Sequence, residues 1–392
     1  FLGVPVLTAH VVAGFITTRA PLSHWIPQLL ALAALWSLGM SNAYQADVRN
    51  CSTQFRTDQD RALTGLLARL DSDLGWSTFT SISAWRRSDY TLSDDLTGVP
   101  LNNPASAATV PENVIDASKE LAKQFSQEFR LTGEKDRFSW VTGLYYLRES
   151  VERAEEFYTQ YSRALQPLGL AAIGDVLFTQ DNVTKSVAAY AQADWRFIDK
   201  WTLTYGVRWS DDKKNIVQNS IDLRGLGSPT GVPLILPQFA APVHAEQSWS
   251  KVTNKVSMNF KPIDGVMLFA TYSQGFKSGA FPSQSNLASV AATAVDPETV
   301  DNVEFGFKSE WWNRRLQLNA VYYDMDYKNL QVFELNSRLL LTLANAQAKS
   351  KGFDVNLNVR PIDGLRLALG YNHSNARYTH FITTSGVDVS GN

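Results

Sequence analysis

Hydrophobic and polar residues alternate along much of this chain from about residue 62 onward. Between Trp201 and Asp211 every second residue is apolar or aromatic, and the residues between them are small or polar. The same alternation recurs in 187–195, 303–311, 353–359 and 365–372. A period of two places successive side chains on opposite faces of a β-strand, whereas a helix repeats about every 3.6 residues. The pattern therefore predicts an all-β protein whose strands have one apolar face and one polar face.

The strands are expected to come in antiparallel pairs joined by very short turns. Pro, Asp, Asn and Gly separate the two runs of each pair and supply the turn geometry. Six hairpins are predicted, at 62–88, 119–150, 183–211, 248–277, 299–329 and 346–378. Much longer segments join one hairpin to the next: 89–118, 151–182, 212–247, 278–298 and 330–345.

This sorting of connections by length distinguishes between β architectures. A soluble β-sandwich or propeller has strands of ~5–6 residues, with connections that are not sorted by length. Outer-membrane barrels have short turns at one rim and long loops at the other. We therefore predict an antiparallel up-and-down transmembrane β-barrel, partial in this chain, with about 12 strands in six hairpins.

The charged residues follow the same alternation. Arg208, Lys308 and Asp354 all take the polar parity of their strands. Because Arg or Lys at a lipid-facing midplane position costs ~2–4 kcal/mol, the polar face is expected to line the interior and the apolar face to contact lipid. The parity is mixed in 76–88 and 137–150. Aromatic residues make up 11% of the chain and cluster beside the short turns, as in the interfacial belts of membrane proteins.

Composition and motifs narrow the range of possible functions. The net charge of -2 gives no reason to expect nucleic-acid binding, and the single cysteine, Cys51, excludes an internal disulfide framework. The five histidines are scattered singly. There is no nucleophile elbow, no phosphate-binding glycine loop and no CxxC pair. We therefore predict no enzyme, no catalytic residue, no metal site and no cofactor.

Several segments in order resemble the barrel of the TonB-dependent receptors. They are the strand Leu268–Phe281 with its Gly-Phe-Lys-Ser-Gly motif, the segment Pro297–Ser309, the return strand Arg315–Val332 and the next strand from Asn345 to Asp354. The resemblance implies a multi-pass barrel in the outer membrane of a Gram-negative bacterium. It also implies uptake of a ferric siderophore or similar large nutrient, energised by the TonB complex.

The start of the chain departs from that family. Residues 1–48 are left unassigned, because the uncharged stretch 20–46 after Arg19 fits a signal peptide, a transmembrane helix or foreign sequence equally. We assign 49–392 to the barrel and expect it to be incomplete at both ends. No plug domain, TonB box or closing aromatic strand is found, so contact with TonB would run through the missing plug.

Two other functions remain open at this point. A passive porin-type channel would keep the barrel without a plug, and a barrel enzyme or adhesin would need a catalytic constellation or an appended domain. For a receptor, ligand contacts should come from aromatic and polar groups of the long loops. The candidates are Tyr158, Tyr161 and Arg163 in the second loop and Phe276, Lys277 and Phe281 leading into the fourth.

Overall fold

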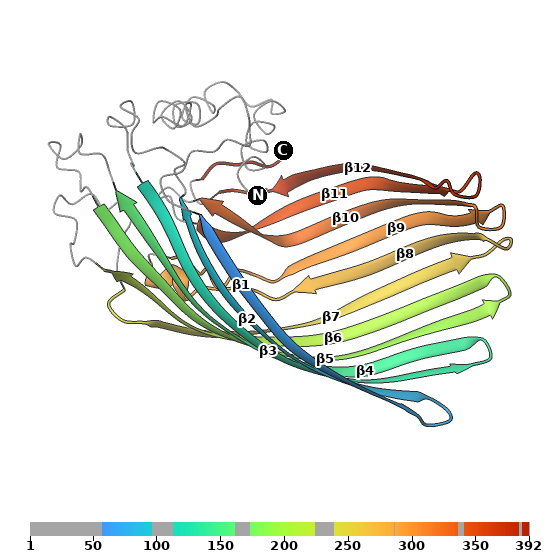
Figure 1. The fold of residues 1–392 in the computed structure, drawn as a ribbon, viewed down its shortest axis with the longest axis horizontal. Coiled ribbons are helices and arrows are strands. Elements are labelled where there is room, and N and C mark those ends of the chain that lie inside the picture. Colours follow the sequence, from blue (N-terminus) through green and yellow to red (C-terminus); the bar gives the residue numbers. More distant parts are fainter. Residues whose placement is uncertain are drawn as a thin grey trace, which may run out of the picture.

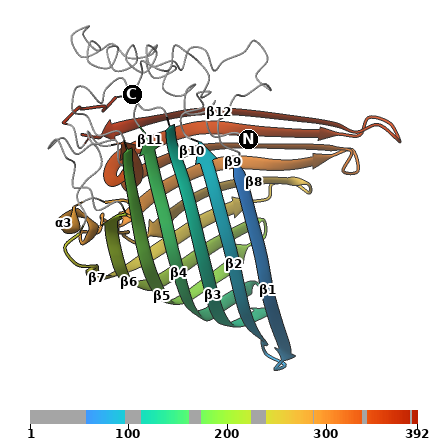
Figure 2. The ribbon, with the colours of Figure 1, turned by 60° about the vertical axis from the view of Figure 1, so that its left-hand side comes forward.

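The computed structural model describes residues 57–95, 113–160, 173–223, 239–285, 287–335, 341–383 and 386–391. In these ranges twelve strands form one antiparallel sheet, in which each strand is hydrogen-bonded to the next along the chain. The sheet curls round, so that one face is concave and the other convex (Figures 1 and 2). The predicted all-β, up-and-down architecture is confirmed. The predicted boundary at residues 48 and 49 lies outside the described residues.

The strands are long. Their bounds are β1 Asp58–Asp73, β2 Thr78–Asp95, β3 Asn113–Lys135, β4 Phe138–Gln160, β5 Ile173–Ile198, β6 Trp201–Asp222, β7 Val243–Phe260, β8 Val266–Lys277, β9 Glu298–Trp311, β10 Leu316–Leu335, β11 Leu341–Val359 and β12 Leu367–His380. One helical turn, α3 at Ala288–Ala291, lies between β8 and β9. Among the described residues no helix is long and apolar enough to cross a membrane.

All six predicted hairpins are present, and their short turns lie together at one end of the sheet (Figure 1). The turns use backbone conformations that favour particular residues. Asp136 and Lys200 have φ of 53° and 77° in two-residue turns, and Gly265 has φ of 78°. A Cβ on Gly265 would lie 2.5 Å from the carbonyl oxygen of Glu310, so both its conformation and its surroundings require glycine.

The strands extend farther toward the long loops than the alternation predicts. Residues 89–95 and 113–118 were expected in a loop, as were 151–160, 173–182 and 212–222, but all are strand. These stretches mix polar and apolar side chains on both faces, so they lack the contrast between faces that marks a strand with one side in lipid. In these strands the period of two therefore finds only the part nearer the short turns.

The polar residues of the alternating strands lie on the concave face of the sheet. On β6, Thr204 and Gly206 are buried on the concave face, whereas Tyr205 and Trp209 are 49% and 42% exposed on the convex face. Cross-strand register carries this assignment to the neighbouring strands, because directly paired residues share a face. Large hydrophobic residues of the convex parity are exposed along the sheet: Trp85, Phe125, Leu144, Val187, Val252, Leu268, Phe305, Tyr322 and Phe353.

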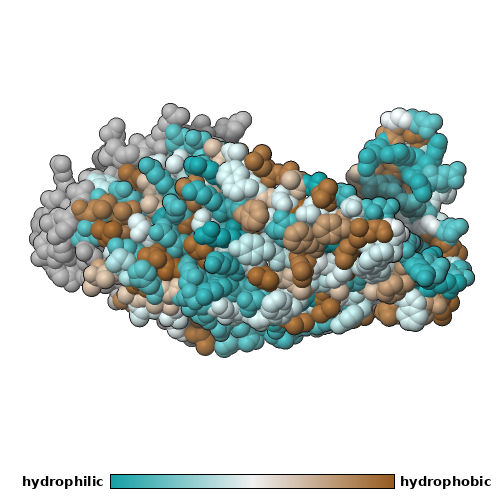
Figure 3. Space-filling view, turned by 90° about the horizontal axis from the view of Figure 1, so that it is seen from below, coloured by the Kyte–Doolittle hydropathy of each residue, from teal (hydrophilic) through white to brown (hydrophobic). Residues whose placement is uncertain are grey.

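Such an extended apolar surface is unusual on a protein that contacts only water and indicates a lipid-facing wall. Figure 3, seen from below, shows hydrophobic residues interspersed with polar ones over this side of the sheet. Aromatic rings gather near the short turns. Trp201 stacks on Phe260 with ring centroids 4.3 Å apart, Trp76 stacks on Trp140 at 6.1 Å, and Trp312 is 72% exposed. These positions match the expected aromatic belt at one membrane interface.

Candidate functional site on the concave face

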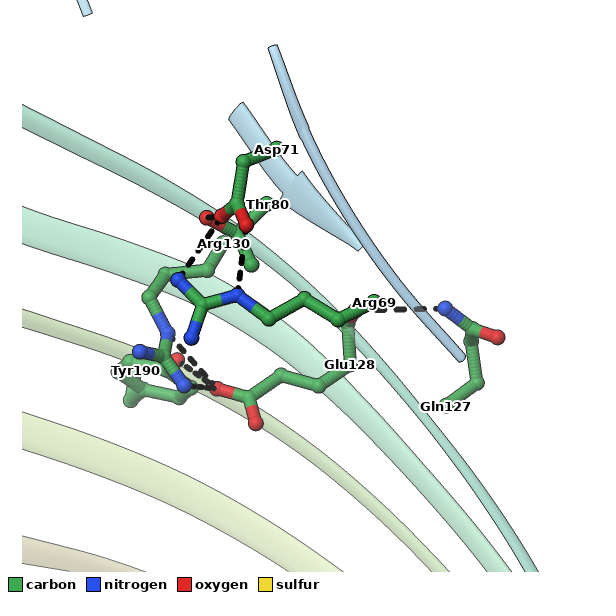
Figure 4. Close-up of polar contacts among 7 residues, drawn as sticks. All are labelled: Arg69, Asp71, Thr80, Gln127, Glu128, Arg130 and Tyr190. Atoms are coloured by element: carbon green, nitrogen blue, oxygen red, sulfur yellow. Dashed lines mark hydrogen bonds and ion pairs between the residues drawn. The ribbon is translucent and has the colours of Figure 1, made fainter. Parts of the chain in front are cut away.

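A row of charged and polar residues crosses the concave face of the first strands (Figure 4). The Arg69 guanidinium donates two hydrogen bonds to Asp71, at 2.7 and 2.9 Å, and Thr80 donates to the same carboxylate at 2.7 Å. In register with Thr80 on β3 lies Arg130. Side-chain hydrogen bonds therefore link β1 to β2, and Arg130 continues the polar row on β3.

The row continues into a second network centred on Glu128. Arg130 donates to its carboxylate at 3.2 and 3.0 Å, and the Tyr190 hydroxyl donates to it from β5 (Figure 4). The Arg208 guanidinium lies over the rings of Tyr145 and Tyr190, 5.7 and 5.8 Å from their centroids. Charges held in this way are partly neutralised, so the wall is polar without carrying a strong net field.

Glycines open space for aromatic rings on the same face. Gly143 is paired directly with Tyr190, and a Cβ at Gly143 would lie 2.6 Å from the tyrosine ring. Gly306 is paired with Phe269 in the same manner, with 2.7 Å between its hypothetical Cβ and the ring. The rings therefore lie flat across the neighbouring glycines and keep the wall smooth instead of projecting into the interior.

At the long-loop end, the segment between β8 and β9 folds over the concave face. Phe281 is only 8% exposed and packs with Ile216 of β6 and Trp249 of β7, which are 2% and 7% exposed. A Cβ on Gly279 would lie 2.4 Å from the Trp249 ring, so the backbone of the loop approaches the wall closely at this point. This apolar cluster anchors the loop.

Polar contacts hold the same loop in place. Gln284 donates to the Glu155 carboxylate on β4 at 2.8 Å, and the Lys214 ammonium donates to the carbonyl of Gly279 at 2.7 Å. The Glu155 carboxylate, 3% exposed as a residue, also accepts a hydrogen bond from Arg153 at 2.9 Å. The buried charge of Glu155 is thus matched by one cation and one amide donor.

Asp116 lies near this anchor, beyond the part of β3 that would span a membrane. It is about twenty residues along β3 from the short turn, roughly twice the ~9–11 residues that a tilted spanning strand needs. Burial, followed by the neighbouring carboxylates of Glu155 and Asp94, raises the pKa of Asp116 to about 6, although Arg153 opposes the shift. One of its carboxyl oxygens has no hydrogen-bond partner in the part of the chain that the structure describes.

The six residues predicted to contact ligand fall into three groups according to where they lie in the structure. Tyr161 and Arg163 lie outside the described residues. Tyr158, near the end of β4, has the parity opposite to that of Glu155 and so points to the convex side. Phe276 packs against the apolar cluster, Lys277 is 60% exposed and 3.9 Å from Glu298, and Phe281 is buried as described above.

Sequence reasoning missed the partners that hold this site together. Glu155 fell within the long segment 151–182 that was expected to be a loop, and neither Trp249 nor Gln284 was singled out. The pairing of Gln284 with Glu155 joins residues 129 positions apart, for which a single sequence carries no signal. Glu128 and Arg130 could have been found, because they share the polar parity of β3.

The polar concave wall suits the passage or retention of a polar solute, or contact with a polar protein surface. Hydroxyls, amides and paired charges line the concave wall, and the described residues contain no group of three or more His, Cys, Asp or Glu side chains placed to hold a metal ion. No nucleophile with an adjacent base stands out among the contacts above.

Comparison with known proteins agrees with this geometry. The family description "TonB dependent receptor-like, beta-barrel" matches residues 25–392. The chain belongs to this family. The match begins within the segment 1–48 that the sequence analysis left unassigned.

Individual relatives are more distant. The probable TonB-dependent siderophore receptor PiuA of Acinetobacter baumannii is 23% identical over 205 residues, which are 51% of this chain and 25% of that protein. The ferric-pyoverdine 358 receptor of Pseudomonas putida is 29% identical over 112 residues, or 27% of this chain and 13% of that protein. The chain thus spans a quarter or less of the curated relatives it matches.

Solved structures share the fold. The ferric yersiniabactin uptake receptor FyuA from Yersinia pestis superposes with a TM-score of 0.65 at 18% identity, covering 86% of this chain and 45% of that one. The structure of PiuA gives a TM-score of 0.61 at 17% identity, with 86% and 50% covered. The copper transporter OprC also matches, with a TM-score of 0.59 at 14% identity over 84% of this chain and 48% of that one. At these identities the likeness concerns the fold of the barrel wall.

Proposed function

We propose that this chain forms part of the barrel of an outer-membrane receptor that takes up a ferric siderophore or a similarly large nutrient in a Gram-negative bacterium. The observation that carries the proposal is the two-sided sheet: a polar concave wall with paired charges and an apolar convex wall with an aromatic belt. Family membership supports the same placement. The chain supplies the wall and the mouth, and no catalytic step is proposed for it.

Energy for uptake would come through the TonB complex acting on a plug domain of the whole protein. The curated relatives named for siderophores favour an iron chelate as the cargo, whereas the copper transporter among the structural neighbours shows that the fold alone does not determine it. The polar, nearly neutral wall around Glu128, Arg130 and Arg208 is compatible with a bulky polar cargo. The loop anchored by Phe281 and Gln284 would shape the mouth on one side.

The test uses the full-length protein in its own host, with the gene deleted and then restored. Radioactive iron supplied on a panel of siderophores is followed into iron-starved cells, with and without an uncoupler of the proton gradient. We expect uptake of at least one ferric chelate to require both the gene and the gradient. Uptake that needs the gene but ignores the gradient would instead identify a passive channel, and no dependence on the gene for any chelate would reject iron as the cargo.

A further inference from the structure

The hydrogen-bond ladder between β7 and β8 is the shortest in the part of the sheet that the structure describes. It holds six residue pairs and ends at Lys255 and Ser273, whereas every other neighbouring pair of strands shares at least twelve. Farther toward the long loops, β7 stays paired with β6 as far as Val243, and β8 with β9 as far as Lys277. The two strands therefore part from each other, and β8 stops well short of the long-loop end of β7 (Figure 1). We call this parting the β7–β8 seam.

The seam begins within the depth that lipid would cover. Lys255 is about five residues from the short-turn end of β7, and Ser273 is about seven from that of β8. At a rise of ~3.3 Å per residue and a tilt of ~45°, both lie about 12–16 Å from the short-turn rim, and the apolar band of such barrels is ~25 Å tall. Backbone without ladder partners is tolerated at that depth only where it is buried in protein or lines a water-filled space. The seam therefore needs a seal other than backbone hydrogen bonds.

The first part of that seal is the side-chain amide of Gln274. Its oxygen accepts hydrogen bonds from the backbone N–H and from the side-chain amide of Asn254 on β7, both at 3.3 Å. The amide nitrogen of Gln274 donates to the carboxylate of Asp301 on β9 at 3.0 Å. One side chain of β8 thus replaces the ladder with β7 at the start of the seam.

The second part of the seal is the ring of Phe276, which makes an apolar contact through the wall. Phe276 has the same parity as Tyr272, whose side chain is exposed on the convex face. The Phe276 ring nevertheless packs against the buried cluster of Ile216, Trp249 and Phe281 on the concave face. A side chain can reach from one face to the other only where backbone hydrogen bonds do not close the wall. An apolar path therefore crosses the wall at Phe276.

The two ends of this path differ in polarity. On the convex side, Val252 at the edge of the seam and Val256 next to it along β7 are 48% and 40% exposed. On the concave side, the Lys214 ammonium lies 5.8 Å from the centre of the Trp249 ring and donates to the carbonyl of Gly279. The indole N–H of Trp249, a residue only 7% exposed, has no acceptor among the described residues. An apolar outer end and an inner end with a cation and an unused donor suit a molecule with one apolar chain and a polar head.

We propose that the β7–β8 seam admits the acyl chain of a single-chain amphiphilic cargo, such as an acylated chelate, whose polar head stays on the concave side near Trp249 and Lys214. In the closed wall the Phe276 ring fills the place that the chain would take, and Gln274 holds the strands together beside it. An acyl chain in that place is favoured for the same reason as the ring it displaces, because both remove apolar surface from water. The inference deepens the proposed function by naming a class of cargo, and it rests on the proposed membrane placement.

The experiment uses the full-length protein in nanodiscs of phosphatidylcholine. One probe is palmitic acid with a photoreactive diazirine in its chain, and the other is phosphatidylcholine that carries the same diazirine chain. After illumination, mass spectrometry measures the label on peptides that contain Trp249 or Phe281, which we call the inner peptides. Peptides that contain Leu144, exposed on the convex face, report contact with lipid, and those that contain Tyr190 report the concave wall away from the seam.

In the unaltered protein we expect palmitic acid to label the inner peptides well above the Tyr190 peptides. Phe276→Asn places an amide in the apolar path, and losing the contact with an apolar side chain of this size should lower the inner labelling about tenfold or more. Gln274→Ala removes the polar part of the seal and should raise the inner labelling. Leu268→Asn is the matched control, because it changes the same face of β8 where the ladder with β7 is intact, and it should leave the inner labelling unchanged.

Inner peptides without label in the unaltered protein, or equal effects of Phe276→Asn and Leu268→Asn, would overturn the proposal. Equal inner labelling by the phosphatidylcholine probe would overturn it as well, because the seam would then take membrane lipid and not a cargo. Label on the Leu144 peptides tests the membrane placement separately. The seam inference alone fails when Leu144 is labelled and the inner peptides are not. Heat-modifiable migration on gels confirms folding of each variant.

Discussion

Removing the Phe281 ring should release the inward-folded loop without unfolding the barrel. The ring is 8% exposed among Ile216 and Trp249, with Ala245, Phe276 and Ala294 at the edge of the cluster. In closed cores, Phe→Ala costs ~3–5 kcal/mol, whereas burial of the side chain alone accounts for ~1.5–3 kcal/mol. This small cluster lies at an open mouth, where water and neighbouring side chains can fill the space left by the ring. We therefore expect Phe281→Ala to weaken docking of the loop by about 2–3 kcal/mol.

That energy corresponds to a shift of about 30- to 150-fold toward the undocked loop. Hydrogen exchange measured by mass spectrometry on peptides covering 287–297 reports it, because the amide of Val295 is held by the carbonyl of Ala280 at 2.9 Å. Leu287→Ala in the same loop is the matched control, since Leu287 is 40% exposed and its loss should leave exchange unchanged. If Phe281→Ala changed exchange by less than about threefold, or by no more than Leu287→Ala, the anchor role would be wrong.

Three further predictions concern the wall, and thermal or urea unfolding of the full-length protein in lipid vesicles measures each. Because the pKa of Asp116 is raised from 3.8 to about 6, ionisation of this carboxyl opposes the folded state, so the free energy of unfolding should fall as pH rises through this range. Asp116→Asn should remove that pH dependence, and an unchanged dependence would exclude Asp116 as its source. Gly143→Ala should cost about 1–3 kcal/mol because its Cβ would meet a ring at 2.6 Å, whereas Gly206→Ala, with its nearest atom at 3.5 Å, should be nearly neutral; equal effects would contradict the packing argument. Leu144 lies on the convex face, 60% exposed and about six residues from the short turn, so Leu144→Arg should lower stability by ~2–4 kcal/mol. Gln192→Arg on the concave face should lower it by less than ~0.5 kcal/mol. The reverse order would mean that the two faces are assigned wrongly.

The sequence was most informative where the two faces of a strand have different surroundings. Trp201 to Trp209 alternates because one side contacts lipid and the other polar groups, and that run was assigned to the right strand and the right faces. The turns were also predictable, since residues such as Gly265 satisfy a local backbone requirement that needs no knowledge of the rest of the fold.

Prediction failed where both faces meet water. The stretch from Asp212 to Asp222 carries polar residues on both sides, so only its hydrogen bonds to β5 and β7 identify it as strand. Local pattern also cannot predict tertiary packing. Phe281 was selected as a ligand contact because it is aromatic and lies in a loop, yet Ile216 and Trp249, from two other strands, surround it.

The length of the strands separates two environments along one continuous piece of chain. β5 has 26 residues, and at ~2.3 Å of height per residue about half of it rises above a bilayer core ~30 Å thick. In the proposed membrane placement, the halves of β3 to β6 nearer the long loops therefore stand above the lipid and hold the loops well clear of it. In that placement, substitutions in the halves nearer the long loops change the polar surface around the loops, whereas the halves nearer the short turns keep the alternation that lipid requires, so the two parts of one strand can vary independently.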